Sequence, residues 1–176
     1  MATATCSAAA VLARIRAGDT IRDAEVSESL GLRAIAEGDY VRREVRFANC
    51  RLTALDIACL HFECLVAFEG CSFGELAGFA AYFLGGLTVQ RCVFESRVDL
   101  SCGGHNQNGT SVLFTECRFG DFVDFSDCWF QGPVLITRCA FDAGSNLLGN
   151  HGRPYAVKFD VPPTIDANSG NLGIDD

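Results

Sequence analysis

The stretch "VLFTECRFGDFVDFSDCWFQGPVLITRCAF" (Val112–Phe141) decides the fold. A small apolar residue, one variable residue and a large apolar residue recur in it, with about two polar residues before the next set. The large members follow one another at steps of five or six residues. That step matches neither the 3.6-residue period of a helix nor the sustained alternation of a long strand. It predicts a short extended segment followed by a corner, repeated many times.

The same pattern extends over most of the chain. Four segments close one square coil, because Phe47, Phe68 and Val89 are 21 residues apart, and Phe114 and Ile136 follow after 25 and 22 residues. Self-similarity at a fixed period of this length indicates a solenoid. The predicted inward pairs are Val45/Phe47, Cys50/Leu52, Leu55/Ile57, Leu60/Phe62, Val66/Phe68, Cys71/Phe73, Ala77/Phe79, Tyr82/Leu84, Leu87/Val89, Cys92/Phe94, Val98/Leu100, Val112/Phe114, Cys117/Phe119, Val123/Phe125, Cys128/Phe130, Val134/Ile136 and Cys139/Phe141.

Stacking of the coils explains the choice of residues. One coil cannot bury its own phenylalanines, but coils stacked about 4.8 Å apart place each large side chain on its equivalents in the neighbouring coils. Each buried large side chain then contributes roughly 1.5–3 kcal/mol, offset by chain entropy. Cysteine recurs at the tight positions because it is small and apolar. The sequence therefore predicts an all-β solenoid with internal columns of phenylalanine and cysteine.

The segments "VAFEGCSFGEL" (66–76) and "VDFSDCWFQGPV" (123–134) resemble the pentapeptide-repeat family in a Phe- and Cys-rich form. The resemblance covers about residues 45–142 and implies a right-handed quadrilateral β-helix. Two features depart from the family pattern. Several steps are six residues, and the usual Asn or Asp before the large residue occurs only at Asp56, Asp99 and Asp124.

The ends of a solenoid need covering. Residues 1–19 are predicted to hold a short N-terminal capping helix, with Ser7 as N-cap and Gly18 just after the end. Residues 20–153 form the β-helix, with a degenerate first coil before the regular part at 45–142. Residues 154–176 are predicted to form a last strand, "YAVKFDV", followed by a mobile acidic tail.

Composition excludes several classes of protein. Fourteen basic and 22 acidic residues give a net charge of −8, which argues against direct binding of nucleic acid. Ten cysteines suggest a disulfide framework only in a secreted protein. The N-terminus is not a signal peptide, since Arg14 and Arg16 interrupt its apolar run, and no segment approaches the ~18 apolar residues of a membrane span. We therefore expect a cytoplasmic location and no membrane partner.

One insertion interrupts the repeat. The segment "CGGHNQNGT" (Cys102–Thr110) replaces a face and lengthens its coil by about four residues. A loop on a rigid scaffold is a candidate binding site, and its candidate contact residues are His105, Asn106, Gln107 and Asn108. The alternative is a tolerated surface insertion.

Two patterns could carry chemistry, and each has a plainer explanation. Cys59, His61 and Cys64 could supply three zinc ligands, but no fourth ligand is evident and structural zinc takes four. The alternative is that these three side chains are exposed and bind no metal, and we expect no cofactor.

An acid–base pair could combine His105 or His151 with Asp99 or Asp124. Both aspartates occupy the same slot of the repeat, however, so the repeat is a sufficient reason for them. No catalytic residue is assigned.

These observations leave three functional hypotheses. The first is a non-enzymatic scaffold that binds a protein partner. The second follows from the family resemblance, which implies a DNA-mimicking modulator of DNA gyrase or topoisomerase and an end-to-end homodimer; mixed charges along the repeat columns argue against it. The third is a metal-dependent or acid–base enzyme near the 103–109 loop.

Overall fold

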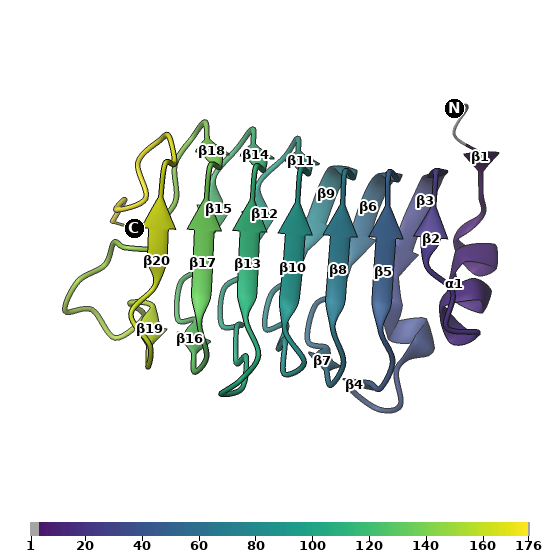
Figure 1. Ribbon diagram of the computed structural model, residues 1–176, viewed down its shortest axis with the longest axis horizontal. Helices are drawn as coiled ribbons and strands as arrows, with labels where there is room; N and C mark the ends of the chain where they lie inside the picture. The colour runs from purple at the N-terminus through teal and green to yellow at the C-terminus, as the bar shows by residue number, and fades with distance from the viewer. Residues whose placement is uncertain (1–3, 176) are drawn as a thin grey trace.

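The computed structural model describes residues 4–175, which wind into a right-handed parallel β-solenoid with four faces (Figure 1). Every pairing between named strands is parallel, as the stacking of successive coils requires. The first face is a seven-stranded sheet made of β2 (Ile21–Arg22), β5 (Val45–Ala48), β8 (Val66–Glu69), β10 (Leu87–Gln90), β13 (Val112–Thr115), β17 (Val134–Thr137) and β20 (Thr164–Asp166).

A nine-stranded sheet forms the second and third faces. Its strands are β1 (Ala4–Thr5), β3 (Ala24–Gly31), β6 (Arg51–Asp56), β9 (Ser72–Ala77), β11 (Val93–Phe94), β14 (Arg118–Phe119) and β18 (Ala140–Phe141), with β12 (Val98–Asp99) and β15 (Val123–Asp124) on the third face. The fourth face carries β4 (Tyr40–Val41), β7 (His61–Phe62), β16 (Trp129–Phe130) and β19 (Lys158–Phe159). A 3-10 helix, η1 (Leu32–Ile35), follows β3.

The registers confirm the predicted interior columns. On the first face Phe47 pairs with Phe68, and Phe68 in turn with Val89. On the second face the rings of Phe73, Phe94, Phe119 and Phe141 stack, with centroids 4.8, 4.9 and 4.7 Å apart. Phe68, Phe114 and Phe125, which the repeat places inside, are 3%, 3% and 1% exposed.

The cysteine column is also inside. Cys50, Cys71, Cys92, Cys117 and Cys139 are at most 3% exposed, and all ten cysteines of the chain are free. The backbone N–H of Cys71 donates to Sγ of Cys92 at 3.4 Å, and that of Cys117 donates to Sγ of Cys139 at 3.5 Å. A hydrogen bond with Cys71, together with burial, raises the pKa of the Cys50 thiol. Cysteine thus serves in this column as a small, apolar and stackable side chain.

Left-handed backbone makes the corner between the first and second faces. Asn49, Arg91, Glu116 and Arg138 have φ values of 54°, 52°, 56° and 54°, a region that non-glycine residues rarely adopt. The hydrogen bonds between coils hold them there, because the N–H of each donates to a carbonyl of the next coil, as from Asn49 to Glu69 at 2.8 Å. The turn then directs the following cysteine inward.

The predicted capping helix is confirmed. Helix α1 spans Ala8–Arg16, and Oγ of Ser7 accepts a hydrogen bond from the N–H of Ala10 at 3.3 Å. Val11 and Ile15 are fully buried against the first coil, and Gly18 ends the helix with a φ of 85°. The helix covers the N-terminal end of the solenoid (Figure 1).

The C-terminal segment differs from the prediction of a strand and mobile tail. Only Lys158 and Phe159 of "YAVKFDV" are in a strand, and the residues beyond form a further coil. Strand β20 pairs with β17, which places Ile165 on Ile136, and lies beside β17 at the end of the sheet (Figure 1). The carbonyl oxygen of Ser169 then accepts a hydrogen bond from the N–H of Phe141, and its own N–H donates to the carbonyl oxygen of Cys139, both at 2.9 Å. This coil forms because it covers apolar side chains that the repeat leaves open.

The predicted register is wrong in one coil. Phe79 is 45% exposed and Leu84 is only half-buried, whereas Ala81 and Phe83 are buried. Gly78 takes the inward slot that Ile57 fills one coil earlier, and Leu100 from the next coil occupies the space, since a Cβ on Gly78 would lie 2.8 Å from Cδ2 of Leu100.

Candidate functional site

The inserted segment 102–110 is built into the fourth face. Gly104 occupies the strand position, where it bridges Tyr82 on one side and Trp129 on the other. Its φ is 92°, and a Cβ there would lie 2.9 Å from the carbonyl oxygen of Trp129. The position therefore excludes a side chain. The next residue, His105, has a φ of 54° and supplies the ring that Gly104 cannot.

A column of five rings, which we call the aromatic ladder, runs along the fourth face. Its members are Tyr40, His61, Tyr82, His105 and Trp129. Successive ring centroids lie 4.9, 4.5, 3.9 and 5.6 Å apart. The rings contact one another and leave their edges at the surface, where Tyr40 and Trp129 are each 39% exposed. Such edge and stacked contacts stabilise neighbouring coils.

Charge is unfavourable within the ladder. Burial lowers the pKa of His105, and the nearby His61 lowers it further, against a weaker opposing effect of Asp127. His105 is therefore neutral at pH 7. It acts as an aromatic member of the ladder, whereas the sequence predicted it as a contact residue of a projecting loop.

The rest of the loop is fastened to the body of the protein. The Asn106 side chain is fully buried, and its Nδ2 donates to the carbonyl oxygens of Thr110 and Pro133 at 3.0 and 3.2 Å. Of the four predicted contact residues, only Gln107 and Asn108 are exposed. They line a hollow of about 530 Å³, which we call the loop hollow, together with Gln131, Asp160 and Val161.

The predicted zinc ligands do not form a site. Cys59 is exposed at a corner, Cys64 is half-buried, and the ring of His61 is packed between Tyr40 and Tyr82. Within residues 4–175, no three His, Cys, Asp or Glu side chains are grouped so that they could hold a metal ion.

The candidate acid–base residues are engaged elsewhere. Asp99 and Asp124 pair in register on the third face, and each accepts hydrogen bonds from the backbone N–H and the hydroxyl of the serine two residues later. No hydrogen bond among the described residues joins them to His105 or His151. The aspartates instead shape the turn that follows each strand.

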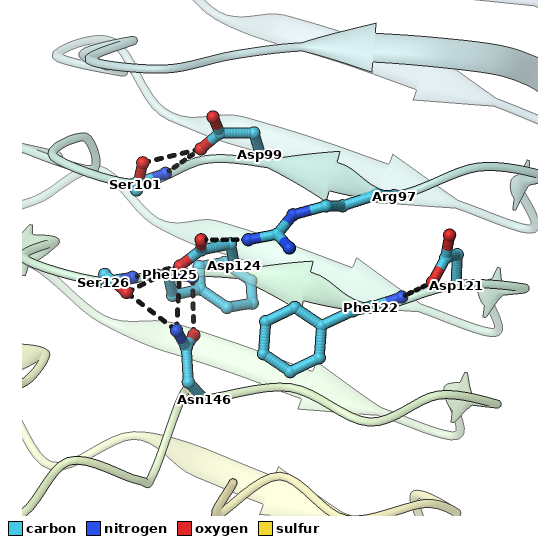
Figure 2. Close-up of polar contacts among 9 residues, drawn as sticks. All are labelled: Arg97, Asp99, Ser101, Asp121, Phe122, Asp124, Phe125, Ser126 and Asn146. Carbon is cyan, nitrogen blue, oxygen red and sulfur yellow. Dashed lines mark hydrogen bonds and ion pairs between the residues drawn. The ribbon is translucent and has the colours of Figure 1, made fainter. Parts of the chain in front are cut away.

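A polar network surrounds Asp124 (Figure 2). Oδ1 accepts from Nδ2 of Asn146 at 2.8 Å, and Oδ2 accepts from the Arg97 guanidinium at 2.7 Å. Arg97 also lies 5.2 Å from the centroid of the Phe122 ring. Burial opposes ionisation of Asp124, but the hydrogen bonds from Asn146 and Ser126 and the contact with Arg97 outweigh it and lower the pKa.

The third face is acidic. Its outward positions on residues 54–58, 75–79, 96–101, 121–126 and 144–146 carry five carboxylates and one cation, and we call this surface the acidic face. The charged members are Asp56, Glu75, Arg97, Asp99, Asp121 and Asp124. No ion pair engages Glu75 or Asp99 within the described chain.

A groove of about 350 Å³ crosses the acidic face, lined by Glu75, Leu76, Ala77, Ser96, Arg97 and Asp99. It exists because Ala77 stands in the column between Asp56 and Asp99 and is too small to fill its place. The groove thus combines apolar lining with two carboxylates and one guanidinium.

Several charges elsewhere on the solenoid are paired. At the first corner Arg91 pairs with Glu69, and Arg138 pairs with Glu116 at 3.0 Å, each pair joining adjacent coils. On the second face Arg118 pairs with Asp142 at 2.8 Å. This confirms the mixed charge columns read from the sequence at these positions. On the acidic face, Asp124 is the one carboxylate of the five that is in an ion pair among the described residues.

The sequence did not reveal the ladder or the acidic face. The ladder has a signal, since Tyr40, His61 and Tyr82 are spaced by 21 residues, the coil period. The acidic face has a weaker signal, because Ala77 interrupts the column of aspartates and Glu75 lies in the neighbouring column.

The architecture defines a parallel β-solenoid protein. No family model, no curated protein and no solved structure matches the chain. Over residues 4–175, the search for a helix of sufficient length and apolarity to cross a membrane finds none.

Proposed function

We propose that the protein is a non-enzymatic pentapeptide-repeat scaffold that binds a basic protein partner through its acidic face. The observation that carries the proposal is the concentration of uncompensated carboxylates on one flat side of a rigid solenoid. Arg91, Arg118 and Arg138 pair with carboxylates of adjacent coils, whereas Glu75 and Asp99 make no ion pair among the described residues.

The groove gives the partner a place to insert. Leu76 and Ala77 give it an apolar lining, and Glu75, Arg97 and Asp99 give it a charged lining in which carboxylates outnumber the cation. A lysine or arginine side chain matches this arrangement, since its apolar stem can lie on the apolar lining while its charged end meets a carboxylate. Arg97 contacts Phe122 and Asp124 on the same face, so a guanidinium of the chain itself already binds in this manner.

Complementary charge also favours rapid encounter. A face with net negative potential steers a basic partner toward it, and the effect weakens as ionic strength increases. We expect the complex to form at physiological salt and to dissociate at about 0.5 M salt, where the Debye length is only a few ångströms.

DNA mimicry is the second candidate, and the acidic face is the observation that favours it. Asp99 and Asp124 repeat at the coil spacing, so their carboxylates form part of an acidic stripe. Such a stripe could occupy a site for the DNA backbone on gyrase or another topoisomerase. A supercoiling assay tests this candidate, and the absence of inhibition or protection at micromolar protein would reject it.

Affinity capture with two matched variants tests the scaffold function. Glu75→Gln with Asp99→Asn removes two charges from the acidic face, and Asn at 99 can still accept the hydrogen bonds from Ser101. Glu69→Gln with Glu116→Gln removes two charges from the first corner and serves as the control. Captured proteins are crosslinked and identified by mass spectrometry.

We expect the wild type and the corner control to retain the same basic partner and the acidic-face variant to lose it. Equal retention of that partner by both variants would contradict a role for the acidic face.

A further inference from the structure

The loop hollow lies on another side of the solenoid from the groove of the acidic face. Three segments far apart in the sequence form it: residues 107–108 of the insertion, Gln131, and residues 160–161 of the last coil. With about 530 Å³ it is within the range of small-molecule sites. Neither the repeat nor the scaffold function explains why these polar side chains gather there.

The lining of the hollow has a distinct chemistry. Gln107, Asn108 and Gln131 each present a carboxamide, which offers a donor and an acceptor on adjacent atoms. Asp160 adds a carboxylate. No cation lines the hollow, so its chemistry does not suit a phosphate or a carboxylate ligand.

Trp129 orients the carboxylate. Its indole Nε1 donates to Oδ1 of Asp160 at 2.9 Å, which leaves the second carboxylate oxygen to accept from a ligand. Val161, which lines the hollow, is 38% exposed, and the residue Trp129, which contacts Asp160, is 39% exposed, so apolar surface lies beside the polar groups. Trp129 is the one tryptophan of the chain.

The base of the hollow is rigid. Asn106 ties the loop to Thr110 and Pro133, and the N–H of Gly132 donates to the carbonyl oxygen of Asn106 at 3.0 Å. Oγ1 of Thr110 donates to the carbonyl oxygen of Leu84 at 3.1 Å. A ligand therefore meets side chains on a fixed backbone, which lowers the entropy lost on binding.

We propose that the loop hollow binds a neutral saccharide, either free or at the end of a glycan. Each hydroxyl of a pyranose both donates and accepts a hydrogen bond, as each carboxamide does, and two neighbouring hydroxyls match the free acceptor of Asp160 and an amide. The C–H face of the sugar would contact Trp129 or Val161. The competing ligand is a basic side chain. The hollow suits it less well, because Asp160 is its one carboxylate and already accepts a hydrogen bond from Trp129.

Titration of the full chain with cellobiose, maltose, lactose and N,N′-diacetylchitobiose, each to about 10 mM, tests the proposal. The fluorescence of Trp129, which is bonded to Asp160, reports on the surroundings of the hollow, and ¹H–¹⁵N spectra follow the side-chain amides of Gln107, Asn108 and Gln131. We expect at least one sugar to give a saturable change in both signals. Binding of the fluorescently labelled protein to a glycan array then distinguishes the two kinds of ligand. A site for the terminal sugar of a glycan gives a signal on the array, whereas a site for free sugars does not.

Three variants assign the binding to the hollow. Gln131→Ala should weaken the sugar's affinity at least tenfold, and Asn108→Ala should weaken it as well. Gln90→Ala, on the first face, is the control and should bind as the wild type does.

Two results would overturn the proposal. One is the absence of a saturable response to every sugar, or a response that Gln131→Ala leaves unchanged. The other is a saturable response to Nα-acetyl-lysinamide in place of the sugars, which would make the hollow a site for a basic side chain. Since the acidic-face variants do not touch the hollow, failure here leaves the scaffold function to be decided by its own experiment.

Discussion

Asn168 completes the column of buried cysteines that ends at Cys139. Its side-chain oxygen accepts a hydrogen bond from the backbone N–H of Cys139 at 2.8 Å. One coil earlier, Sγ of Cys139 accepts the equivalent hydrogen bond from the N–H of Cys117. Its Nδ2 also donates to the carbonyl oxygen of Ile136 at 2.7 Å. A polar residue thus takes the place of a thiol in the last described coil.

We expect Asn168→Ala to lower the free energy of unfolding by about 1–3 kcal/mol, because it leaves the backbone groups of Cys139 and Ile136 without partners. Asn168→Cys should be less destabilising, since a thiol can take the place in the column. Urea unfolding followed by circular dichroism measures both. Asn108→Ala, at an exposed loop position, is the control and should change stability by no more than about 0.5 kcal/mol.

Phe119→Ala tests the phenylalanine column. The Phe119 ring lies between those of Phe94 and Phe141, with centroids 4.9 and 4.7 Å away, and its residue is 1% exposed. Truncation leaves a cavity between fixed coils, so we expect a loss of about 3–5 kcal/mol in chemical denaturation. Val93→Ala, at a position 41% exposed on the same face, should cost far less. Similar losses for the two variants would contradict the stacked interior.

Asp124→Asn tests the polar network of the acidic face. The lowered pKa means that ionised Asp124 stabilises the folded state above its ordinary pKa of 3.8, and that this stabilisation is lost as pH falls through the lower, folded value. At pH 7 we expect the variant to be less stable by about 1–3 kcal/mol. The difference should shrink by pH 3, as unfolding curves at both pH values would show. A difference that does not change with pH would contradict the assignment.

The titration of His105 tests the electrostatics of the ladder. Its folded pKa lies below 6.5, so the unfolded state binds the proton more readily, and the stability that neutral His105 provides is lost as pH falls below 6.5. NMR of the imidazole Cε1–H should give a midpoint below 6.5. His61→Gln removes the imidazole whose electrostatic effect lowers the pKa of His105, and it should raise the midpoint. A midpoint at or above 6.5 in the wild type would refute the burial of this ring.

Gly104 and Gly109 offer a matched pair of substitutions. Both have positive φ, 92° and 98°, but a Cβ at Gly109 meets nothing within 4 Å, whereas one at Gly104 lies 2.9 Å from the Trp129 carbonyl oxygen. Gly109→Ala should therefore cost about 1–2 kcal/mol for the backbone alone. Gly104→Ala should cost about 1–3 kcal/mol more and shift the fluorescence of Trp129. Equal losses would mean that the close contact has no effect.

The repeat period predicted more of the fold than local hydrophobicity did. Residues 21 positions after Leu55, Ile57 and Phe62 are Leu76, Gly78 and Phe83, and these three lie inside the next coil. Choosing the nearest large residue instead selected Phe79, which is exposed. In a solenoid a residue is placed by its equivalents in the adjacent coils, so even a glycine can hold an inward slot when a neighbour fills the space.

The candidate site was less predictable, for a physical reason. The insertion was evident from composition, and Gln107 and Asn108 are exposed as expected for a loop. Yet His105 stacks in the ladder, because Gly104 takes the strand position and the backbone turns left-handed at both residues. Gln107 lines the loop hollow together with Asp160 and Val161, which lie more than 50 residues further along the chain. No repeat relates these two segments.

The two ends of the solenoid give the molecule a direction for unfolding. Helix α1 closes one end with Val11 and Ile15 fully buried, whereas the coil at the other end is held by β20, the side chain of Asn168 and hydrogen bonds of residues 169–175, with most of its side chains exposed or half-buried. In a structure whose coils contact only their neighbours, the least secured coil melts first and exposes the next. Thermal or mechanical unfolding should therefore begin at the C-terminal coil. A domain fused at that end would be affected by this local unfolding earlier than a domain fused next to α1.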